Sequence, residues 1–376
     1  MKVKRMEQIV WQQVFSNYHN LNYNLDKPQR LCFLHNTEGD QLRLEMTNQY
    51  DEQPLIVDSL RISDNAHFEQ AVTVTSEGMA TFNIPAFSKI WTDTVLFPIH
   101  AGKPLYVEIT VRNQKGTINT LASSLDHHLV EVLDYEDDIQ QNFYFGITTI
   151  QAETSSKMTI GFFGDSLTNQ GYFSNQVATM LYEEYPNEVT TFNAGISGNR
   201  LLLAGNSKSE WNESFGPAGV ERFKVDVLEK SPQLVVSMIG INDLFHPGAG
   251  CPENELPTAD ALIKAIKKLS EVCSERGILF VPMTITPFKG AVNREISSWN
   301  PIKEAIRSKV NDFIRSYPHC IDIAARIEQT DDVASLQGLY DCGDHLHFSP
   351  DGAVVIGTAV FNVLKPLIDS AIKVEI

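Results

Sequence analysis

Cysteine is scarce in this chain, which has only five among its 376 residues. They are widely scattered and never form a Cys-x-x-Cys pair: Cys32, Cys251, Cys273, Cys320 and Cys342. A disulfide framework needs an even set of cysteines at compact spacings. The cysteine pattern therefore excludes a disulfide scaffold and is typical of a protein kept in a reducing compartment.

Long apolar runs are also missing. No segment approaches the roughly 18 apolar residues that a membrane-spanning helix needs. The basic residues 1–5 are followed only by Ile9-Val10-Trp11 before two glutamines end the run, and no small-residue cleavage site follows. We therefore expect no signal peptide, no membrane partner and a cytoplasmic location.

Positive charge is in short supply. Thirty Lys and Arg residues face 47 Asp and Glu, which gives a formal net charge of −17. Such acidity argues against nucleic acid or an anionic membrane as a partner. With 43% hydrophobic and 20% charged residues the composition is that of a globular protein, and the length predicts two domains.

The first part of the chain alternates between apolar and polar residues. From about Gln29 to Glu153 the period is two. Four runs show this alternation: 42–47, 55–62, 71–75 and 105–111. Turn signals rich in Gly and Pro separate the runs, and no convincing helical pattern lies between them. The pattern predicts an antiparallel β-sandwich domain over residues 1–155.

From about Met158 onward, short apolar runs alternate with helical periodicity. Three runs predict buried strands: 158–163, 234–239 and 278–283. Between the last two, apolar residues from Leu262 to Cys273 recur at helical spacing, and Gly277 stands where a C-cap belongs. Strands that alternate with helices predict an α/β domain, here residues 156–376, with a parallel sheet and helices on both faces.

Two later helices have clear start signals. Asn300 is an N-cap followed by a first-turn proline, and the helix it opens carries four apolar residues on one face: Ile302, Ile306, Val310 and Phe313. Ser349 and Pro350 repeat the same arrangement. They predict the start of the last helix, so His347 lies in the loop just before it.

Polar motifs follow the predicted strands, at the carboxyl ends where the site of an open α/β sheet lies. The first is Gly164-Asp165-Ser166-Leu167. A serine at a strand-to-helix turn exposes its hydroxyl and has its N–H near a helix N-terminus, which suits a nucleophile that also stabilises an oxyanion. The alternative is a plain turn with an N-capping serine.

Two further motifs supply candidate hydrogen-bond donors. The segment 193–200 reads Asn-Ala-Gly-Ile-Ser-Gly-Asn-Arg, and its glycines allow backbone N–H groups close to a substrate. Asn242 follows the clearest buried strand, and its amide is a candidate second oxyanion donor. The alternatives are a tight loop with glycines at positive φ and an ordinary turn-forming asparagine.

The fourth motif is Asp344-His345-Leu346-His347. The Asp-x-x-His spacing lets the carboxylate fold back in a turn, hold the imidazole of His347, fix its tautomer and stabilise its protonated form. Two alternatives remain open. One is a surface turn, and the other is a metal site in which both histidines join Asp341, Cys342 and Asp344.

Together, the four motifs resemble the blocks of the SGNH or GDSL hydrolase superfamily, which carry Ser, Gly, Asn and His. The resemblance covers roughly Met158–Leu367 and implies a three-layer, flavodoxin-like hydrolase domain. By motif position it implies that Ser166 is the nucleophile, His347 the general base and Asp344 the residue that orients it. It places the oxyanion hole at the backbone N–H groups of Ser166 and Gly198 and the side chain of Asn242.

A looser resemblance extends over both halves. The β-rich first half, with segments 193–202 and 340–348, is similar to the xylan-esterase-like branch of that superfamily. This implies a serine esterase acting on short acyl esters, above all acetyl esters, of a carbohydrate, with no metal and no organic cofactor. That branch is commonly exported, so the missing signal favours a small acylated sugar or oligosaccharide over a polymer.

Three other functions remain open. The chain could be a lipid-directed acylhydrolase or lysophospholipase, or an inactive protein whose sandwich binds carbohydrate. It could also be a metal-dependent hydrolase that uses His345 and His347. The sequence gives neither the acyl length, the alcohol, nor the oligomeric state.

Overall fold

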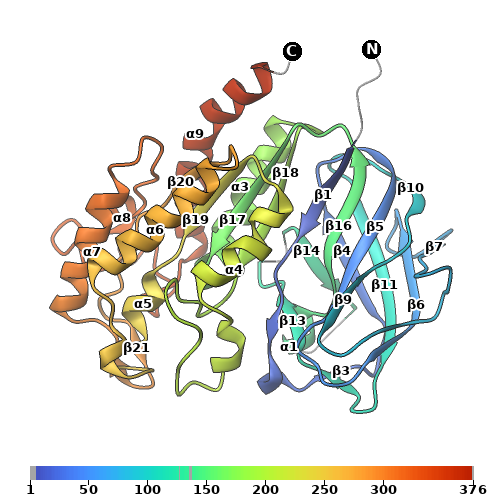
Figure 1. Ribbon diagram of the computed structural model, residues 1–376, viewed down its shortest axis with the longest axis horizontal. Coiled ribbons are helices and arrows are strands. Elements are labelled where there is room, and N and C mark those ends of the chain that lie inside the picture. The colour runs from blue at the N-terminus through green and yellow to red at the C-terminus, as the bar shows by residue number, and fades with distance from the viewer. Residues whose placement is uncertain (1–5, 127, 135–137, 375–376) are drawn as a thin grey trace. The chain divides into compact units, whose positions relative to one another are not determined.

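The computed structural model describes residues 6–126, 128–134 and 138–374 (Figure 1). They form two compact units. The first takes the described residues up to Thr159 together with Ala178–Phe192, and the second takes Ile160–Val177 and the described residues from Asn193 onward. The predicted domain boundary between residues 155 and 156 stays a prediction.

The first unit is built largely of strands, and its described residues also include the short helix α1 (Asp138–Asn142) and the second half of helix α3 (Tyr172–Glu184). The strands are β1 (Met6–Gln12), β2 (Ser16–Asn17), β3 (Tyr23–Asn24), β4 (Gln29–Leu34), β5 (Gly39–Asn48), β6 (Leu55–Ser63), β7 (Val72–Thr73), β8 (Phe82–Ile84), β9 (Ser88–Trp91), β10 (Val95–Ile99), β11 (Pro104–Arg112), β12 (Thr117–Ile118), β13 (Thr120–Ser123), β14 (Val130–Leu133), β15 (Phe143–Tyr144) and β16 (Gly146–Thr154).

Two antiparallel sheets form the body of this unit. One has the order β1-β16-β5-β10 with β9 beside β5, and the other has the order β14-β4-β11-β6-β7 with β8 beside β6. Their inner faces meet in an aromatic core, where the rings of Trp11 and Phe33 lie 4.5 Å apart between centroids. The antiparallel sandwich is confirmed, although the run predicted at 71–75 forms only the two-residue β7.

The α/β part begins with β17, and its helices outnumber its long strands. The strands are β17 (Met158–Gly164), β18 (Val189–Gly195), β19 (Leu234–Met238), β20 (Leu279–Pro282), β21 (Val292–Asn293) and β22 (Ile296–Ser297). The helices are α2 (Ser166–Asn169), α3 (Tyr172–Glu184), α4 (Gly219–Asp226), α5 (Ile241–Phe245), α6 (Ala259–Ser274), α7 (Pro301–Ile314), α8 (Ala324–Ile327) and α9 (Pro350–Val374).

The central sheet has the strand order β18-β17-β19-β20, and β19 pairs in parallel with both β17 and β20. Every residue of β17 and β19 is buried, as expected for strands covered on both faces. Helices α4 and α6 lie in front of this sheet in Figure 1 and α9 passes behind it. The predicted α/β class with a parallel sheet is confirmed.

Helix α7 buries a face that only partly matches the apolar one seen in the sequence: Val310 is buried, as predicted. Its N-cap Asn300 accepts hydrogen bonds from the N–H groups of Ile302 and Lys303, as predicted. Ile302, however, is 65% exposed, whereas Lys303 and Arg307 are buried. Both cations donate to buried backbone carbonyls, and Arg307 also pairs with Glu304. Because these partners compensate the buried charges, the helix can turn a charged face inward.

The long helix α9 is apolar enough, by length and composition, to cross a membrane. A core helix of a folded domain passes the same test. The buried residues of α9 recur at helical spacing: Ala353, Ile356, Val360, Leu364 and Ile368. Gly357 lies against Phe173 and Gln176 of α3, so α9 covers part of the α/β unit.

Candidate active site

Ser166 lies at the sharp turn between β17 and the single-turn helix α2. The N-cap is Asp165, whose side chain accepts a hydrogen bond from the N–H of Leu167. Only glycine fits at position 164, because a Cβ there would lie 2.3 Å from the carbonyl oxygen of Met238. This close approach of strand and helix holds Ser166 at the carboxyl end of the sheet, as predicted.

A continuous line of hydrogen bonds joins three of the predicted site residues. Nε2 of His347 lies 2.9 Å from Oγ of Ser166, and Nδ1 of His347 lies 2.6 Å from Oδ2 of Asp344. Ser166 and His347 are 181 positions apart in sequence. When Nδ1 carries the proton and donates a hydrogen bond to the carboxylate, Nε2 is free to accept the serine proton.

Asp344 forms the turn that the Asp-x-x-His spacing predicts. Its Oδ1 accepts hydrogen bonds from the N–H groups of Leu346 and His347, at 2.9 and 2.8 Å. Burial raises the pKa of Asp344, but the hydrogen bonds and charge of His347 outweigh it and hold that pKa well below its ordinary range. The carboxylate of Asp344 is therefore already ionised when His347 takes up a proton and needs a negatively charged partner.

Of the two other predicted site residues, Gly198 lies in the loop after β18, and Asn242 of α5 contacts the same loop. Gly198 has a φ of +72°, and a Cβ there would lie 2.1 Å from the Phe215 ring, so the position requires glycine. Asn242, in the first turn of α5 and only 3% exposed, donates to the carbonyl of Asn199 at 3.2 Å. Its amide retains a second hydrogen for another acceptor.

Arg222, a buried residue of α4 that is not among the predicted site residues, joins these loops. Its guanidinium donates to the carbonyls of Gly164 and Ala194, both at 2.8 Å, and to Oδ1 of Asn199 at 2.9 Å. It also pairs with Asp226, which offsets the cost of its burial. Arg222 thus fixes the strand ends that carry the serine and the glycine loop, although no sequence motif marks it.

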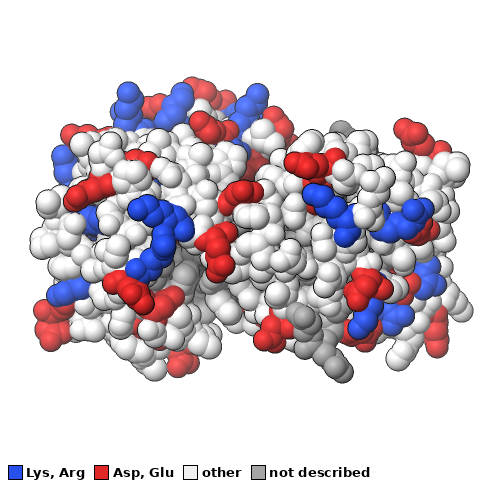
Figure 2. Space-filling model, turned by 90° about the horizontal axis from the view of Figure 1, so that it is seen from below, with Lys and Arg blue, Asp and Glu red and all other residues white. Residues whose placement is uncertain are grey.

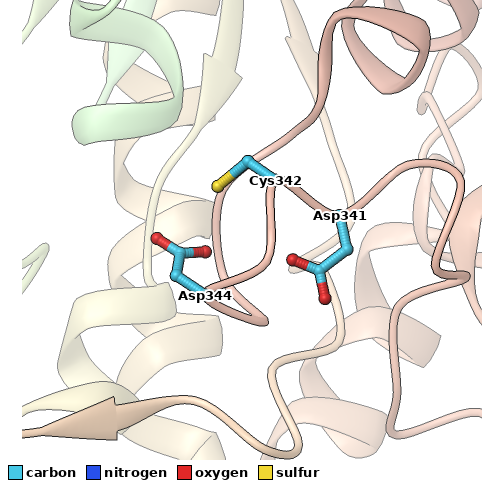
Figure 3. A group of neighbouring side chains, drawn as sticks. All are labelled: Asp341, Cys342 and Asp344. Atoms are coloured by element: carbon cyan, nitrogen blue, oxygen red, sulfur yellow. The ribbon is translucent and has the colours of Figure 1, made fainter.

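His345 occupies a separate arrangement from His347. Its Nδ1 lies 2.7 Å from Oδ2 of Asp341, and its ring packs against Gly290. The ligand atoms of Asp341, Cys342 and Asp344 lie within 4.8 Å of one another on one turn (Figure 3). Neither histidine belongs to this group, and both carboxylates already accept hydrogen bonds from an imidazole and from backbone N–H groups.

Asp165 is a buried carboxyl group with an incomplete set of partners. It is 1% exposed, and its Oδ2 has no partner within the part of the chain that the structure describes. Burial raises the pKa of Asp165 to about 7, although the hydrogen bond from the N–H of Leu167 acts in the opposite direction. We conclude that Asp165 is protonated in the folded protein at moderately acidic pH.

This raised pKa predicts a pH-dependent stability. Between about pH 4 and 7 the unfolded chain ionises Asp165 while the folded protein keeps it protonated, so this group lowers the free energy of unfolding as pH rises. Asp165→Asn should remove the effect. The free energy of unfolding of the variant should therefore rise relative to that of wild type by on the order of 4 kcal/mol between pH 4 and 7. Urea unfolding of both proteins from pH 4 to 8 measures the difference.

Asp243 is a second buried carboxyl group, and its pKa is also raised, to about 6, chiefly by burial. Both proteins contain Asp243, but its charge helps to raise the pKa of Asp165, so the difference between the two stability curves includes the interaction of the two carboxyl groups. Parallel stability curves for wild type and Asp165→Asn would show that Asp165 is ionised in the folded protein and would refute the interpretation.

One comparison with known proteins matches the α/β part of the chain. Residues 160–360, more than half of the chain, match the family model described as GDSL-like Lipase/Acylhydrolase. The comparison with curated proteins returned no match.

Among solved structures, the chain is similar to a GDSL-like lipase from Bacteroides thetaiotaomicron, with 20% identity and a TM-score of 0.39 over 57% of this chain and 89% of that one. It is also similar to an acetylxylan esterase from Geobacillus stearothermophilus, with 19% identity and a TM-score of 0.41 over 55% of this chain and 94% of that one. At these values neither structure carries an inference about substrate. The family match is what decides the assignment: the chain belongs to the GDSL-like lipase/acylhydrolase family and is a carboxylic ester hydrolase.

Proposed function

We propose that the protein hydrolyses esters by two-step acyl transfer through Ser166. The observation that carries the proposal is the unbroken hydrogen-bonded line from Ser166 through His347 to Asp344. His347 takes the proton of the serine hydroxyl as Oγ attacks the ester carbonyl, and Asp344 stabilises the imidazolium. His347 then activates a water molecule that releases the acyl group.

The negative charge that develops on the carbonyl oxygen needs donors. We assign this role to the backbone N–H groups of Ser166 and Gly198 and to the side-chain amide of Asn242. The positive φ of Gly198 and the buried, loop-bound amide of Asn242 support the assignment. Donors held in place before the reaction stabilise the transition state without a reorganisation cost.

Asn242→Ala tests the assignment of the side-chain donor. A bond that is stronger in the transition state than in the ground state affects kcat, so we expect kcat to fall by ~10²–10³ with little change in KM. Steady-state kinetics on one ester, with the melting temperature of the same sample, measure both effects. An unchanged kcat with a lowered melting temperature would make Asn242 a structural residue and leave only backbone donors.

For the substrate we propose a short acyl ester, above all an acetyl ester, of a sugar or oligosaccharide. The support is the resemblance of segments 193–202 and 340–348, together with the β-sandwich in the first unit, to the xylan-esterase-like branch. The main competing substrate is a long-chain lipid ester. The two differ in acyl length, which is directly measurable.

A panel of esters tests this proposal. We expect kcat/KM for 4-nitrophenyl esters to be highest with acetyl or butyryl and to fall at least ~10-fold by octanoyl, because each added methylene must fit the acyl site. Acetylated xylo-oligosaccharides should also be turned over. A maximum at octanoyl or longer would favour the lipid-directed function, and absence of turnover on every ester would favour an inactive carbohydrate-binding protein.

A further inference from the structure

A concave site lies in the α/β unit, outside the hydrogen-bonded line described above. It is a pocket of about 380 Å³ lined by Lys208, by the loop from Gly248 to Pro252, and by Arg294 and Ile296. Its walls come from the loops that follow β18, β19 and β20. These are the loops at the carboxyl edge of the sheet, the edge that also carries Ser166.

The charge of this pocket is opposite to that of the protein. Lys208 and Arg294 are its charged lining residues, and no Asp or Glu lines it. Within the described part of the chain, neither cationic side chain has a hydrogen bond or ion pair. Glu253 approaches Gly248 without lining the pocket. In a chain of net charge −17, two unpaired cations on one small pocket form a local site for an anion.

Figure 2 shows a group of Lys and Arg side chains beside a hollow on the unit that holds β21, with Asp and Glu side chains next to the group, and both signs of charge also occur over the rest of that face. A concave site lined by one sign of charge raises the local concentration of ligands of the other sign.

Arg294 is held in place by a strained turn. Val292 pairs with Ser297 and Asn293 with Ile296, so the β21–β22 hairpin has a two-residue turn formed by Arg294 and Glu295. Both turn residues have positive φ, 51° and 66°. Such turns favour Asn-Gly, and longer side chains there are strained. Arginine is unfavourable at this backbone conformation, but here it places a positive charge on the pocket. A role for that charge explains why the strained position holds an arginine.

His246 links this pocket to the glycine loop of the catalytic site. Its Nε2 lies 3.2 Å from the carbonyl oxygen of Gly198, and its Nδ1 lies 3.4 Å from the amide nitrogen of Asn293 in the hairpin. Gly250 of the pocket wall lies against the same ring. One buried imidazole therefore separates the pocket from the loop that carries the proposed oxyanion donor.

We propose that the Lys208–Arg294 pocket binds an anionic group of the ester substrate, so that the preferred substrate is an acylated acidic sugar. This inference rests on the proposed function. The two cations and the adjoining apolar Ile296 suit a carboxylate or a phosphate on a sugar ring, because a guanidinium binds either group with two N–H donors. Both cationic residues are exposed, so a neutral sugar ester would leave the two charges solvated by water and without an anionic partner.

A matched series of substrates tests the inference. Methyl glucoside, methyl glucuronoside and methyl glucoside 6-phosphate, each acetylated at the same hydroxyl group, present the same ester beside a neutral, a carboxylate and a phosphate group. We expect wild-type kcat/KM to favour at least one charged ester over the neutral one by about tenfold or more, through a lower KM. Whichever charged ester is preferred identifies the anion.

Two charge-removing variants and one control locate the effect. Lys208→Gln and Arg294→Gln should each lower the charged-to-neutral ratio at least ~3-fold, and the double variant should bring it to about one. Arg294→Lys should retain part of the preference. Lys268→Gln, which removes an exposed cation of α6 that does not line the pocket, should leave the ratio at the wild-type value.

The outcomes separate the two proposals. Equal kcat/KM on all three sugars, or a preference that survives the double variant, overturns the pocket assignment and leaves the esterase proposal standing. Absence of turnover on all three sugars and on 4-nitrophenyl acetate overturns the esterase proposal, and the pocket assignment falls with it.

The strain gives a readout that does not depend on activity. Arg294→Gly removes the cation and permits the positive φ, so it should raise the melting temperature by about 2–4 °C. Wild-type or lower stability in Arg294→Gly would show that the turn stores no strain for Arg294 and would remove that support.

Discussion

Ser166→Ala should lower kcat for ester hydrolysis by about 10⁴–10⁶, and His347→Ala should do the same. The nucleophile and its base act as one unit, because the hydroxyl attacks only when Nε2 of His347 takes its proton. For that reason the double variant should be little worse than either single variant. Single-turnover and steady-state kinetics on 4-nitrophenyl acetate measure all three.

A serine elsewhere in the α/β unit controls for nonspecific damage. Ser316 is exposed at the end of α7, where its hydroxyl donates to the carbonyl of Phe313. Ser316→Ala should keep the wild-type rate, and all variants should keep the wild-type circular dichroism spectrum. A folded Ser166→Ala protein with most of the wild-type rate would end the acyl-transfer mechanism.

Asp344→Asn should lower kcat by up to ~10⁴ without unfolding the protein. An asparagine amide donates where the carboxylate accepts, so it favours the tautomer in which Nδ1 of His347 has no proton. Nε2 then carries the proton and cannot accept from Ser166. The two backbone hydrogen bonds to Oδ1 can persist, which is why the turn should survive.

The neighbouring histidine is the matched comparison. His345 lies two positions away and pairs with Asp341, yet no hydrogen bond joins it to Ser166 within the described residues. His345→Ala should therefore lower kcat far less than Asp344→Asn. The opposite ranking would mean that the two Asp–His pairs have been assigned to the wrong roles.

The fold was largely predictable because its patterns are local. Alternation over 105–111 predicts β11, and the apolar run at 234–239 predicts β19, since a strand buried on both faces is apolar throughout. Helix α7 shows the limit. Its start followed from Asn300, but its buried face followed only in part, because Lys303 and Arg307 find carbonyl and carboxylate partners that only the folded chain supplies.

The contacts of the site were likewise predictable only in part. The spacing of Asp344 and His347 encodes their own turn, so that contact was predictable from four residues. The approach of His347 to Ser166 joins loops 181 positions apart, and only the resemblance to known motif blocks suggested it. Arg222 was missed, because a lone arginine on a helix has no pattern that distinguishes it from a surface residue.

Labelling with a serine-directed phosphonate tests the central claim most directly. The reagent forms a stable covalent adduct only with an activated serine, and intact-mass spectrometry with peptide mapping locates it. The mechanism predicts one adduct per chain, on Ser166, that forms much more slowly in His347→Ala and not at all in Ser166→Ala. A protein that hydrolyses esters while Ser166 stays unmodified would contradict it.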